Sequence, residues 1–247
     1  MRYFIELSYD GTPFVGWQRQ PKGDSVQSCL EDALAILLQK PISVVGAGRT
    51  DAGVHARQLF AHVDLDMQID QELKFRLNKL LPKEIAVRSI VAVGQDVHAR
   101  FDAVSRSYCY HITTQKNPFL YKRSYQFAKP LDIESMNKAA DILLHHEDFK
   151  CFSKSKTDVK TYTCDVQHAH WKQNGSELVF FIQANRFLRN MVRAIVGTLI
   201  EVGLGKISIS DFKAILASRD RSQAGYSVPA HGLYLENVSY PKHIFAV

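Results

Sequence analysis

The chain has 247 residues, of which 46% are hydrophobic and 23% are charged. A chain of this length and composition can bury an ordinary core, which excludes a disordered protein and suits one large domain or two closely packed ones. The formal net charge of +6 favours a polyanionic partner such as nucleic acid. The four cysteines lie far apart with no CxxC pair, a pattern that argues against a disulfide framework or zinc site and fits a cytoplasmic protein.

The first hundred residues alternate between strand and helix patterns. In the first predicted helix, Val26, Leu30 and Leu34 recur at helical spacing, and Asp24 with Gln27 forms the expected capping pair. The expected elements are a strand over 2–9, a helix over 25–39, strands over 42–45 and 59–65, a helix over 71–81 and a strand over 85–93. This part of the chain therefore has the order β-α-β-β-α-β.

The remaining residues show the same order of patterns. The expected elements are a strand over 107–113, a helix over 133–145, a hairpin of strands over 161–171 and 177–184, helices over 188–202 and 211–217, and a strand over 233–240. The predicted class is α+β, with two ferredoxin-like (RRM-like) halves, 1–104 and 105–247. We expect the halves to share one antiparallel sheet with a central catalytic cleft.

The segment GAGRTDAGVHA, residues 46–56, is the most unusual stretch of the sequence. Its glycines allow positive φ angles and close approach of another backbone or a ligand. A carboxylate beside an arginine on such a loop can be held ionised and aimed at a substrate. Alternatively, the segment is a glycine-rich turn in which Asp51 caps its own backbone. The dinucleotide fingerprint and the phosphate-binding P-loop are both excluded by the residues that follow Gly46.

Five blocks in order resemble the tRNA pseudouridine synthase A family. They are YDGTPFVGWQRQ, GRTDAGVHA, the tyrosine-containing VHARFDAVSRSYCYHI, and IQANRFLRNMVRAIVGTLIEVG with the closing AGYSVPAHGLYLENVSY. The sequence departs from the usual family pattern at His145 and His146, near Lys160 and at Tyr226. These departures do not touch the residues to which the family assigns its chemistry.

The resemblance implies an isomerase that converts uridine to pseudouridine at positions 38, 39 and 40 in the anticodon stem-loop of tRNA. It implies that Asp51 is the catalytic carboxylate and that Arg193, in MVRAI, pairs with it. Tyr108 corresponds to the family tyrosine that stacks on the target uracil, whereas we expect its neighbour Tyr110 in the core. Arg49 would help to displace the target nucleotide, with pairing to Asp51 as its alternative role.

The resemblance further implies a cytoplasmic homodimer that binds tRNA and needs neither metal nor cofactor. His55, His168 and His170 are accordingly expected to be structural or surface residues. Eight further basic residues could line a tRNA-binding surface: Arg2, Arg19, Lys22, Arg57, Arg76, Lys79, Arg100 and Arg106.

Two other functions remain open from the residues alone. One is a catalytically inactive RNA-binding module built on RRM-like halves, which an intact set of Asp51, Tyr108 and Arg193 disfavours. The other is a carboxylate hydrolase acting on a sugar or nucleoside, which would need a second carboxylate such as Asp10 or Asp102.

Overall fold

A computed structural model describes residues 1–70, 72–155 and 159–245 of the protein. The chain forms two compact units, Met1–Val104 with Tyr234–Val247, and Ser105–Leu233. Both units are mixed α+β, and most of their strand pairs are antiparallel. Within the described residues, no helix has the length and apolar character needed to cross a membrane.

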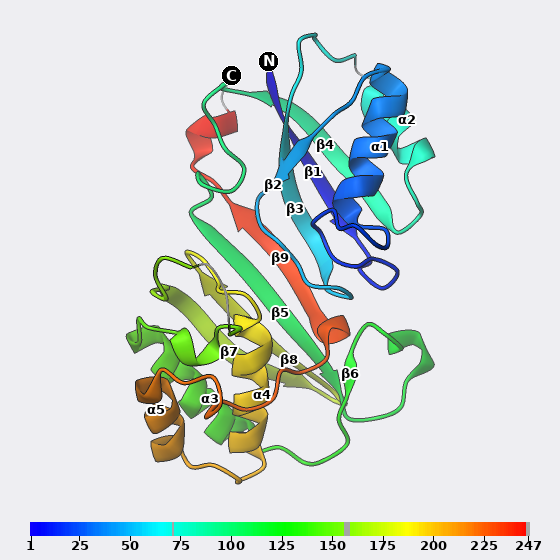
Figure 1. Ribbon diagram of the computed structural model, residues 1–247. Coiled ribbons are helices and arrows are strands. Elements are labelled where there is room, and N and C mark those ends of the chain that lie inside the picture. The colour runs from blue at the N-terminus through cyan, green and yellow to red at the C-terminus, as the bar shows by residue number, and fades with distance from the viewer. Residues whose placement is uncertain (71, 156–158, 246–247) are drawn as a thin grey trace. The chain divides into compact units, whose positions relative to one another are not determined.

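The first unit has the predicted order of strands and helices. Its elements are β1 (Arg2–Tyr9), α1 (Val26–Leu38), β2 (Val44–Gly46), β3 (His55–Asp64), α2 (Leu73–Leu80), β4 (Ile85–Val93) and β9 (Leu233–Ser239). The strands follow the order β4–β1–β3, and β2 and β9 also pair with β3. Helices α1 and α2 lie over one face of these strands (Figure 1).

The start of α1 differs from the predicted cap. Ser25, rather than Asp24, is the N-cap residue, and Ser28, rather than Gln27, completes the reciprocal capping box. The hydroxyl of Ser25 accepts from the N–H of Ser28 at 3.0 Å, while the Ser28 hydroxyl accepts from the N–H of Ser25 at 3.0 Å. Serine serves at this third position because its short side chain can reach back to the cap backbone. Gln27 is thereby left for a different role.

The last segment of the chain belongs to the first unit because it pairs and packs there. Strand β9 runs parallel to β3 through the pair His55 and Tyr234. The ring of Phe4, which is fully buried on β1, lies 5.2 Å from the ring of Tyr240. The predicted halves, 1–104 and 105–247, placed this segment with the second half, because the order of patterns along the chain does not record a return to the first unit.

The second unit places three helices on one face of its strands. Its elements include β5 (Ser105–Thr113), β6 (Tyr125–Gln126), α3 (Ile133–Ile142), β7 (Val166–Asn174), β8 (Glu177–Ala184), α4 (Met191–Gly203) and α5 (Ile209–Ser218). The strand order is β5–β8–β7, with β6 beside β5. Alternate residues of β8, such as Phe180 and Ile182, are buried and face the helices.

Several boundaries in the second unit differ from the predicted ones. Helix α4 begins at Met191 rather than Leu188, because Asn190 adopts the left-handed conformation with φ of 68°. Strand β7 begins at Val166, five residues after the predicted start of the hairpin. The short β6 was not predicted, since two residues carry no periodicity that a sequence pattern can reveal.

Candidate active site

Asp51 lies on a loop that is anchored on both sides within the first unit. Trp17 donates its backbone N–H to the carbonyl oxygen of Thr50 at 3.1 Å, and Gly16 and Asp51 form an isolated antiparallel bridge. The buried hydroxyls of Thr50 and Tyr9 are 2.8 Å apart. These contacts fix the backbone that carries Asp51. The residue itself is half-buried and so remains partly accessible. Arg49, on the same loop, is exposed.

Two glycines explain why the segment after β1 can lie against this loop. Gly16 has φ of +111°, and a Cβ there would lie 2.5 Å from the carbonyl oxygen of Thr50. A Cβ on Gly11 would lie 2.0 Å from the carbonyl oxygen of Val54. Only glycine allows both backbones to approach so closely. The blocks YDGTPFVGWQRQ and GRTDAGVHA are thus parts of one structure.

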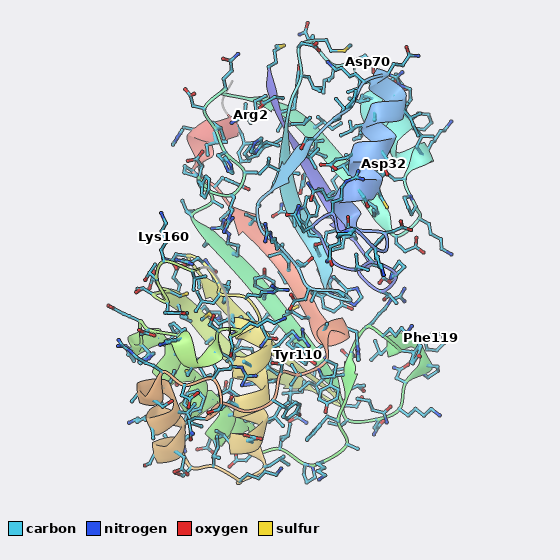
Figure 2. The ribbon with its side chains drawn as sticks, in the orientation of Figure 1. Arg2, Asp32, Asp70, Tyr110, Phe119 and Lys160 are labelled. Carbon is cyan, nitrogen blue, oxygen red and sulfur yellow. The ribbon has the colours of Figure 1, made fainter. Side chains whose placement is uncertain are left out.

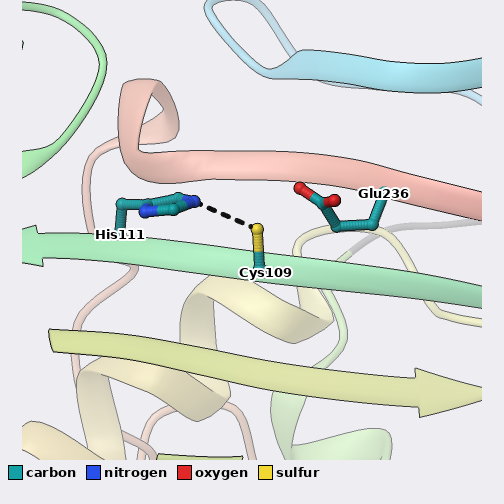
Figure 3. Close-up of side chains that lie close together, drawn as sticks. All are labelled: Cys109, His111 and Glu236. Atoms are coloured by element: carbon teal, nitrogen blue, oxygen red, sulfur yellow. Dashed lines mark hydrogen bonds between the residues drawn. The ribbon is translucent and has the colours of Figure 1, made fainter. Parts of the chain in front are cut away.

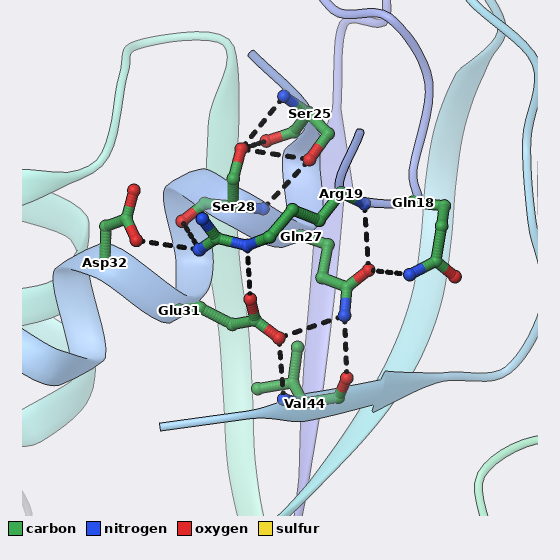
Figure 4. Close-up of polar contacts among 8 residues, drawn as sticks. All are labelled: Gln18, Arg19, Ser25, Gln27, Ser28, Glu31, Asp32 and Val44. Atoms are coloured by element: carbon green, nitrogen blue, oxygen red, sulfur yellow. Dashed lines mark hydrogen bonds and ion pairs between the residues drawn. The ribbon is translucent and has the colours of Figure 1, made fainter. Parts of the chain in front are cut away.

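A buried polar network that joins α1, Arg19 and β2 was not predicted (Figure 4). Glu31 on α1 is almost fully buried, and its Oε1 accepts from the backbone N–H of Val44 at 3.0 Å and from the amide of Gln27 at 2.9 Å. The other oxygen of Glu31 accepts from Nε of Arg19 at 2.9 Å. Arg19 also pairs with Asp32 at 2.7 Å. The network ties α1 to β2, which precedes the Asp51 loop in the sequence. It also ties α1 to Arg19, which follows the residues 16–17 that contact this loop.

His55 and the two aspartates considered for a hydrolase have local contacts within the first unit. The buried Nδ1 of His55 accepts from the N–H of Gly11 at 3.1 Å, and a carboxylate oxygen of Asp10 lies 3.1 Å from the same nitrogen. Asp10 also accepts from the N–H of Thr12, and Asp102 from the N–H of His98. Asp10 and Asp102 therefore cap loops of the backbone, which fits a structural role.

Tyr108 and Tyr110 point to the helix-covered face of β5 in the second unit. Tyr110 is fully buried, as predicted, and its hydroxyl donates to the carbonyl oxygen of Pro229 at 2.8 Å. Burial raises the pKa of Tyr110 above its ordinary value, which keeps this donor protonated. Tyr108 is half-buried, with its ring edge-on to Phe187 at 5.1 Å between centroids. Tyr108 thus retains accessible ring surface.

Arg193 is held by the segment that precedes β9. Its Nε donates to the carbonyl oxygen of Val228 at 2.8 Å, and the N–H of Val228 donates to the carbonyl oxygen of Arg193 at 3.2 Å. The same segment is fixed to α4 through Asn190, whose amide donates to the hydroxyl of Ser227 at 2.7 Å. The side chain of Arg193 is therefore positioned by a backbone carbonyl.

The face of α4 that carries Arg193 is covered by the segment that precedes β9. A Cβ on Gly197 would lie 1.8 Å from the carbonyl oxygen of Tyr226, and Gly225 donates its N–H to the hydroxyl of Thr198 at 2.9 Å. Gly197 and Thr198 are buried beneath this segment. Two glycines permit the close crossing, and the segment AGYSVP belongs to the same structure as MVRAIVG.

Cys109 and His111 lie on the other face of β5. The Sγ of buried Cys109 is 3.2 Å from Nε2 of His111 (Figure 3). Glu236, drawn in the same view, is paired within the first unit with Arg57 at 2.8 Å. A structural zinc site takes four ligands, and this thiol and imidazole would supply only two of them.

His168 and His170 lie on β7, and their rings are 4.3 Å apart.

Four of the eight basic residues considered for tRNA binding are paired with carboxylates. The pairs are Arg2 with Asp64, Arg19 with Glu31 and Asp32, Arg57 with Glu236, and Arg76 with Asp70. An arginine whose charge is compensated in this way attracts phosphate less strongly than an uncompensated one. These four residues therefore have roles within the protein itself.

The four residues singled out by the sequence lie in both units. Asp51 and Arg49 share one loop of the first unit, and Tyr108 and Arg193 lie on β5 and α4 of the second. The supporting residues Thr50, Glu31 and Val228 were missed. The sequence signal for Thr50 was its place inside the motif, whereas nothing in the sequence distinguishes a buried glutamate or a backbone acceptor.

Comparisons with known proteins identify the family of this chain. A family model described as tRNA pseudouridine synthase matches residues 7–102 and 139–241. Proteins named tRNA pseudouridine synthase A from Parabacteroides distasonis and Bacteroides fragilis are 53% and 52% identical, covering 100% and 99% of this chain and 98% of each relative. The one from Bacillus subtilis is 41% identical over 97% of this chain and 99% of its own length. The chain belongs to the tRNA pseudouridine synthase family.

Proposed function

We propose that this protein isomerises uridine to pseudouridine at positions 38, 39 and 40 in the anticodon stem-loop of tRNA, with Asp51 as the catalytic carboxylate. The observation that carries the proposal is the anchored loop, which holds a half-buried carboxylate inside the family motif GRTDAGVHA. Membership of the tRNA pseudouridine synthase family supports the reaction on tRNA, and the three positions are those that the sequence motifs imply by their resemblance to the synthase A family.

The reaction needs a positioned carboxylate and no electron transfer. The C1′–N1 bond of uridine breaks, the released uracil turns, and a C5–C1′ bond forms. The C5 hydrogen then leaves as a proton while N1 takes one up, so that atoms and electrons balance. Asp51 can attack the sugar, attack the uracil or remove the C2′ proton, and each route requires its ionised form.

Three further residues complete the proposed site. Tyr108 stacks on the target uracil, and stacking suits a base that must turn because the ring face imposes no hydrogen-bond pattern. Arg193 pairs with Asp51, and the hydrogen bond from its Nε to the carbonyl oxygen of Val228 holds its side chain in place. Arg49 enters the space vacated by the displaced nucleotide, which offsets part of the cost of unstacking it.

We further propose two ferredoxin-like halves with the catalytic cleft between them, in a cytoplasmic homodimer. The order β4–β1–β3 with β2 on β3 supports the first half, and the order β5–β8–β7 supports the corresponding strands of the second. A dimer suits recognition of tRNA by shape, because the bases of A-form RNA are poorly accessible in the major groove.

Mapping of the product tests the proposed substrate positions. Unmodified tRNA transcripts carrying uridine at only one of positions 38, 39 or 40 are incubated with the protein, and pseudouridine is located by carbodiimide modification and primer extension. The proposal predicts pseudouridine at each of these positions. A transcript with cytidine at all three serves as the control, and modification elsewhere in it would contradict the proposed positions.

A further inference from the structure

The connection between β5 and β6 displays two aromatic side chains to solvent. Phe119 is 83% exposed and Tyr121 is 73% exposed, although burial of such rings is strongly favourable. Figure 2 shows Phe119 on this connection in the second unit. Single exposed apolar residues are ordinary, but two large rings separated by one residue form a distinct surface.

The turn that carries these rings has a fixed conformation. Asn117 caps it, with its side-chain oxygen accepting from the N–H of Phe119 at 3.0 Å. Arg123 and Ser124 both donate their backbone N–H groups to the carbonyl oxygen of Leu120, at 2.9 and 3.0 Å. The pairing of β6 with β5 closes the connection. The rings are therefore presented by an ordered scaffold, which lowers the entropy lost when they bind a partner.

The surrounding sequence is positively charged. Residues 103–131 contain no aspartate or glutamate and five basic residues: Arg106, Lys116, Lys122, Arg123 and Lys129. The ammonium of Lys122 lies 5.7 Å from the centre of the Tyr121 ring. Exposed aromatic rings among cations are the chemistry with which proteins bind single-stranded nucleic acid, since bases stack on the rings and phosphates meet the cations.

We propose that Phe119 and Tyr121 form a stacking platform for an unpaired nucleotide of the tRNA, separate from the nucleotide that is isomerised. The inference rests on the proposed tRNA substrate. Tyr108 lies on β5, the strand that leads into this connection, and the five residue steps from Tyr108 to Thr113 span about 17 Å of strand. The platform therefore contacts RNA a few nucleotides from the target.

A second copy of this chain fits the surface less well. A two-fold contact would bring the acid-free segment 103–131 against its own copy, so that like charges would face each other. A stable protein interface also takes about 800 Å² from each partner, more than two side chains provide. RNA carries the opposite charge to this segment, and a single base is small enough to be bound by two aromatic side chains.

The test compares the full-length protein with the double variant Phe119→Ala/Tyr121→Ala in binding to unmodified tRNA. Loss of base stacking predicts a Kd raised about 5-fold or more. KM should rise in parallel, while kcat at saturating tRNA stays unchanged. The salt dependence of binding should also be unchanged in this variant and reduced in Lys122→Gln/Arg123→Gln, because only the second change removes phosphate contacts.

The matched control is Phe75→Ala on α2. Phe75 is 54% exposed and lies beneath the ammonium of Lys79 at 4.3 Å, so this substitution removes a similar surface pair in the first unit. The control should bind tRNA like the wild type. The variant Phe119→Trp should retain binding, and added tRNA should quench its extra fluorescence through stacking.

Three results would overturn the inference. They are a Kd of the double variant within two-fold of the wild type, tight binding of Phe119→Trp without quenching, and an oligomeric state that changes in the double variant by sedimentation. The last result would assign the surface to self-association. Failure of the wild-type protein to bind tRNA would instead reject the proposed function, and the inference with it.

Discussion

Gly197 of α4 and Tyr226 are in direct backbone contact, so close that a Cβ on the glycine would lie 1.8 Å from the tyrosine carbonyl oxygen. Gly197 lies one helical turn after Arg193, and Tyr226 lies two residues before Val228, which accepts from the Arg193 side chain. The contact therefore determines where Arg193, a residue of the proposed site, is held.

Gly197→Ala is expected to displace the segment that covers α4. The clash is with backbone, which cannot rotate away, so we expect a loss of about 1–3 kcal/mol in the free energy of unfolding. We also expect kcat to fall under conditions in which the variant remains folded, because Arg193 is displaced. Urea denaturation and initial rates on tRNA measure the two effects. The control Gly94→Ala, whose nearest neighbour would be 3.4 Å away, should change neither.

The hydroxyl pair of Tyr9 and Thr50 is expected to hold the loop of Asp51. Tyr9→Phe or Thr50→Val leaves one buried hydroxyl without its partner and should each cost about 1–2 kcal/mol. The double variant should cost less than the sum, because it removes both groups. Thermal denaturation of the four proteins gives the coupling, and simple additivity would show that the hydrogen bond does not stabilise the loop.

The buried carboxylate of Glu31 is expected to be needed for the fold of the first unit. Glu31→Ala leaves the buried N–H of Val44 without its acceptor and removes one of the two acceptors of the Gln27 amide, and we expect a loss of about 2–4 kcal/mol. Asp32→Ala removes only the exposed partner of Arg19 and should cost less than about 1 kcal/mol. Equal losses measured by urea denaturation would contradict the assignment of Glu31 to the core network.

Stability is expected to fall in mild acid because of His62. Burial of this ring, with a contribution from nearby Arg2, lowers the pKa of His62 from 6.5 to about 4. Its Nδ1 accepts from the N–H of Ala99 at 3.1 Å, a contact that requires the neutral ring. Between about pH 6.5 and 4 the unfolded chain binds a proton that the folded chain does not, so the free energy of unfolding decreases as pH falls.

The total effect of His62 is up to roughly 3 kcal/mol below pH 4. His62→Asn retains an acceptor near the Nδ1 position and cannot titrate, so the stability of this variant should depend less on pH in that window. Urea denaturation at several pH values compares it with the wild type and with His168→Asn on the exposed part of β7. Parallel curves for wild type and His62→Asn would contradict the assignment.

Sequence patterns predicted the elements of this protein better than the contacts between them. Strand β1 and strand β4 have the predicted bounds, because alternating apolar residues report directly on a strand. The cap at Ser25 was assigned one residue too early, since Asp24 is an equally good capping residue by type. Local preference cannot choose between two adjacent candidates.

The supporting structure of the candidate site depended on contacts that are distant in sequence. Gly197 of α4 is covered by the segment around Tyr226, and Glu31 of α1 is buried beside Val44 of β2. Neither partner can be identified by helical periodicity. The motif around Asp51 identified the loop, whereas its anchor at Tyr9 required the fold.

Tritium release from tRNA that carries 5-tritiated uridine tests the central claim most directly, because formation of the C5–C1′ bond must expel the C5 hydrogen. The wild-type protein and Asp51→Asn are compared, with Asp64→Asn, which alters an exposed carboxylate paired with Arg2, as the matched control. Release by the wild type and the control, with none by Asp51→Asn, is the predicted result. Equal release by all three proteins would contradict the catalytic role of Asp51.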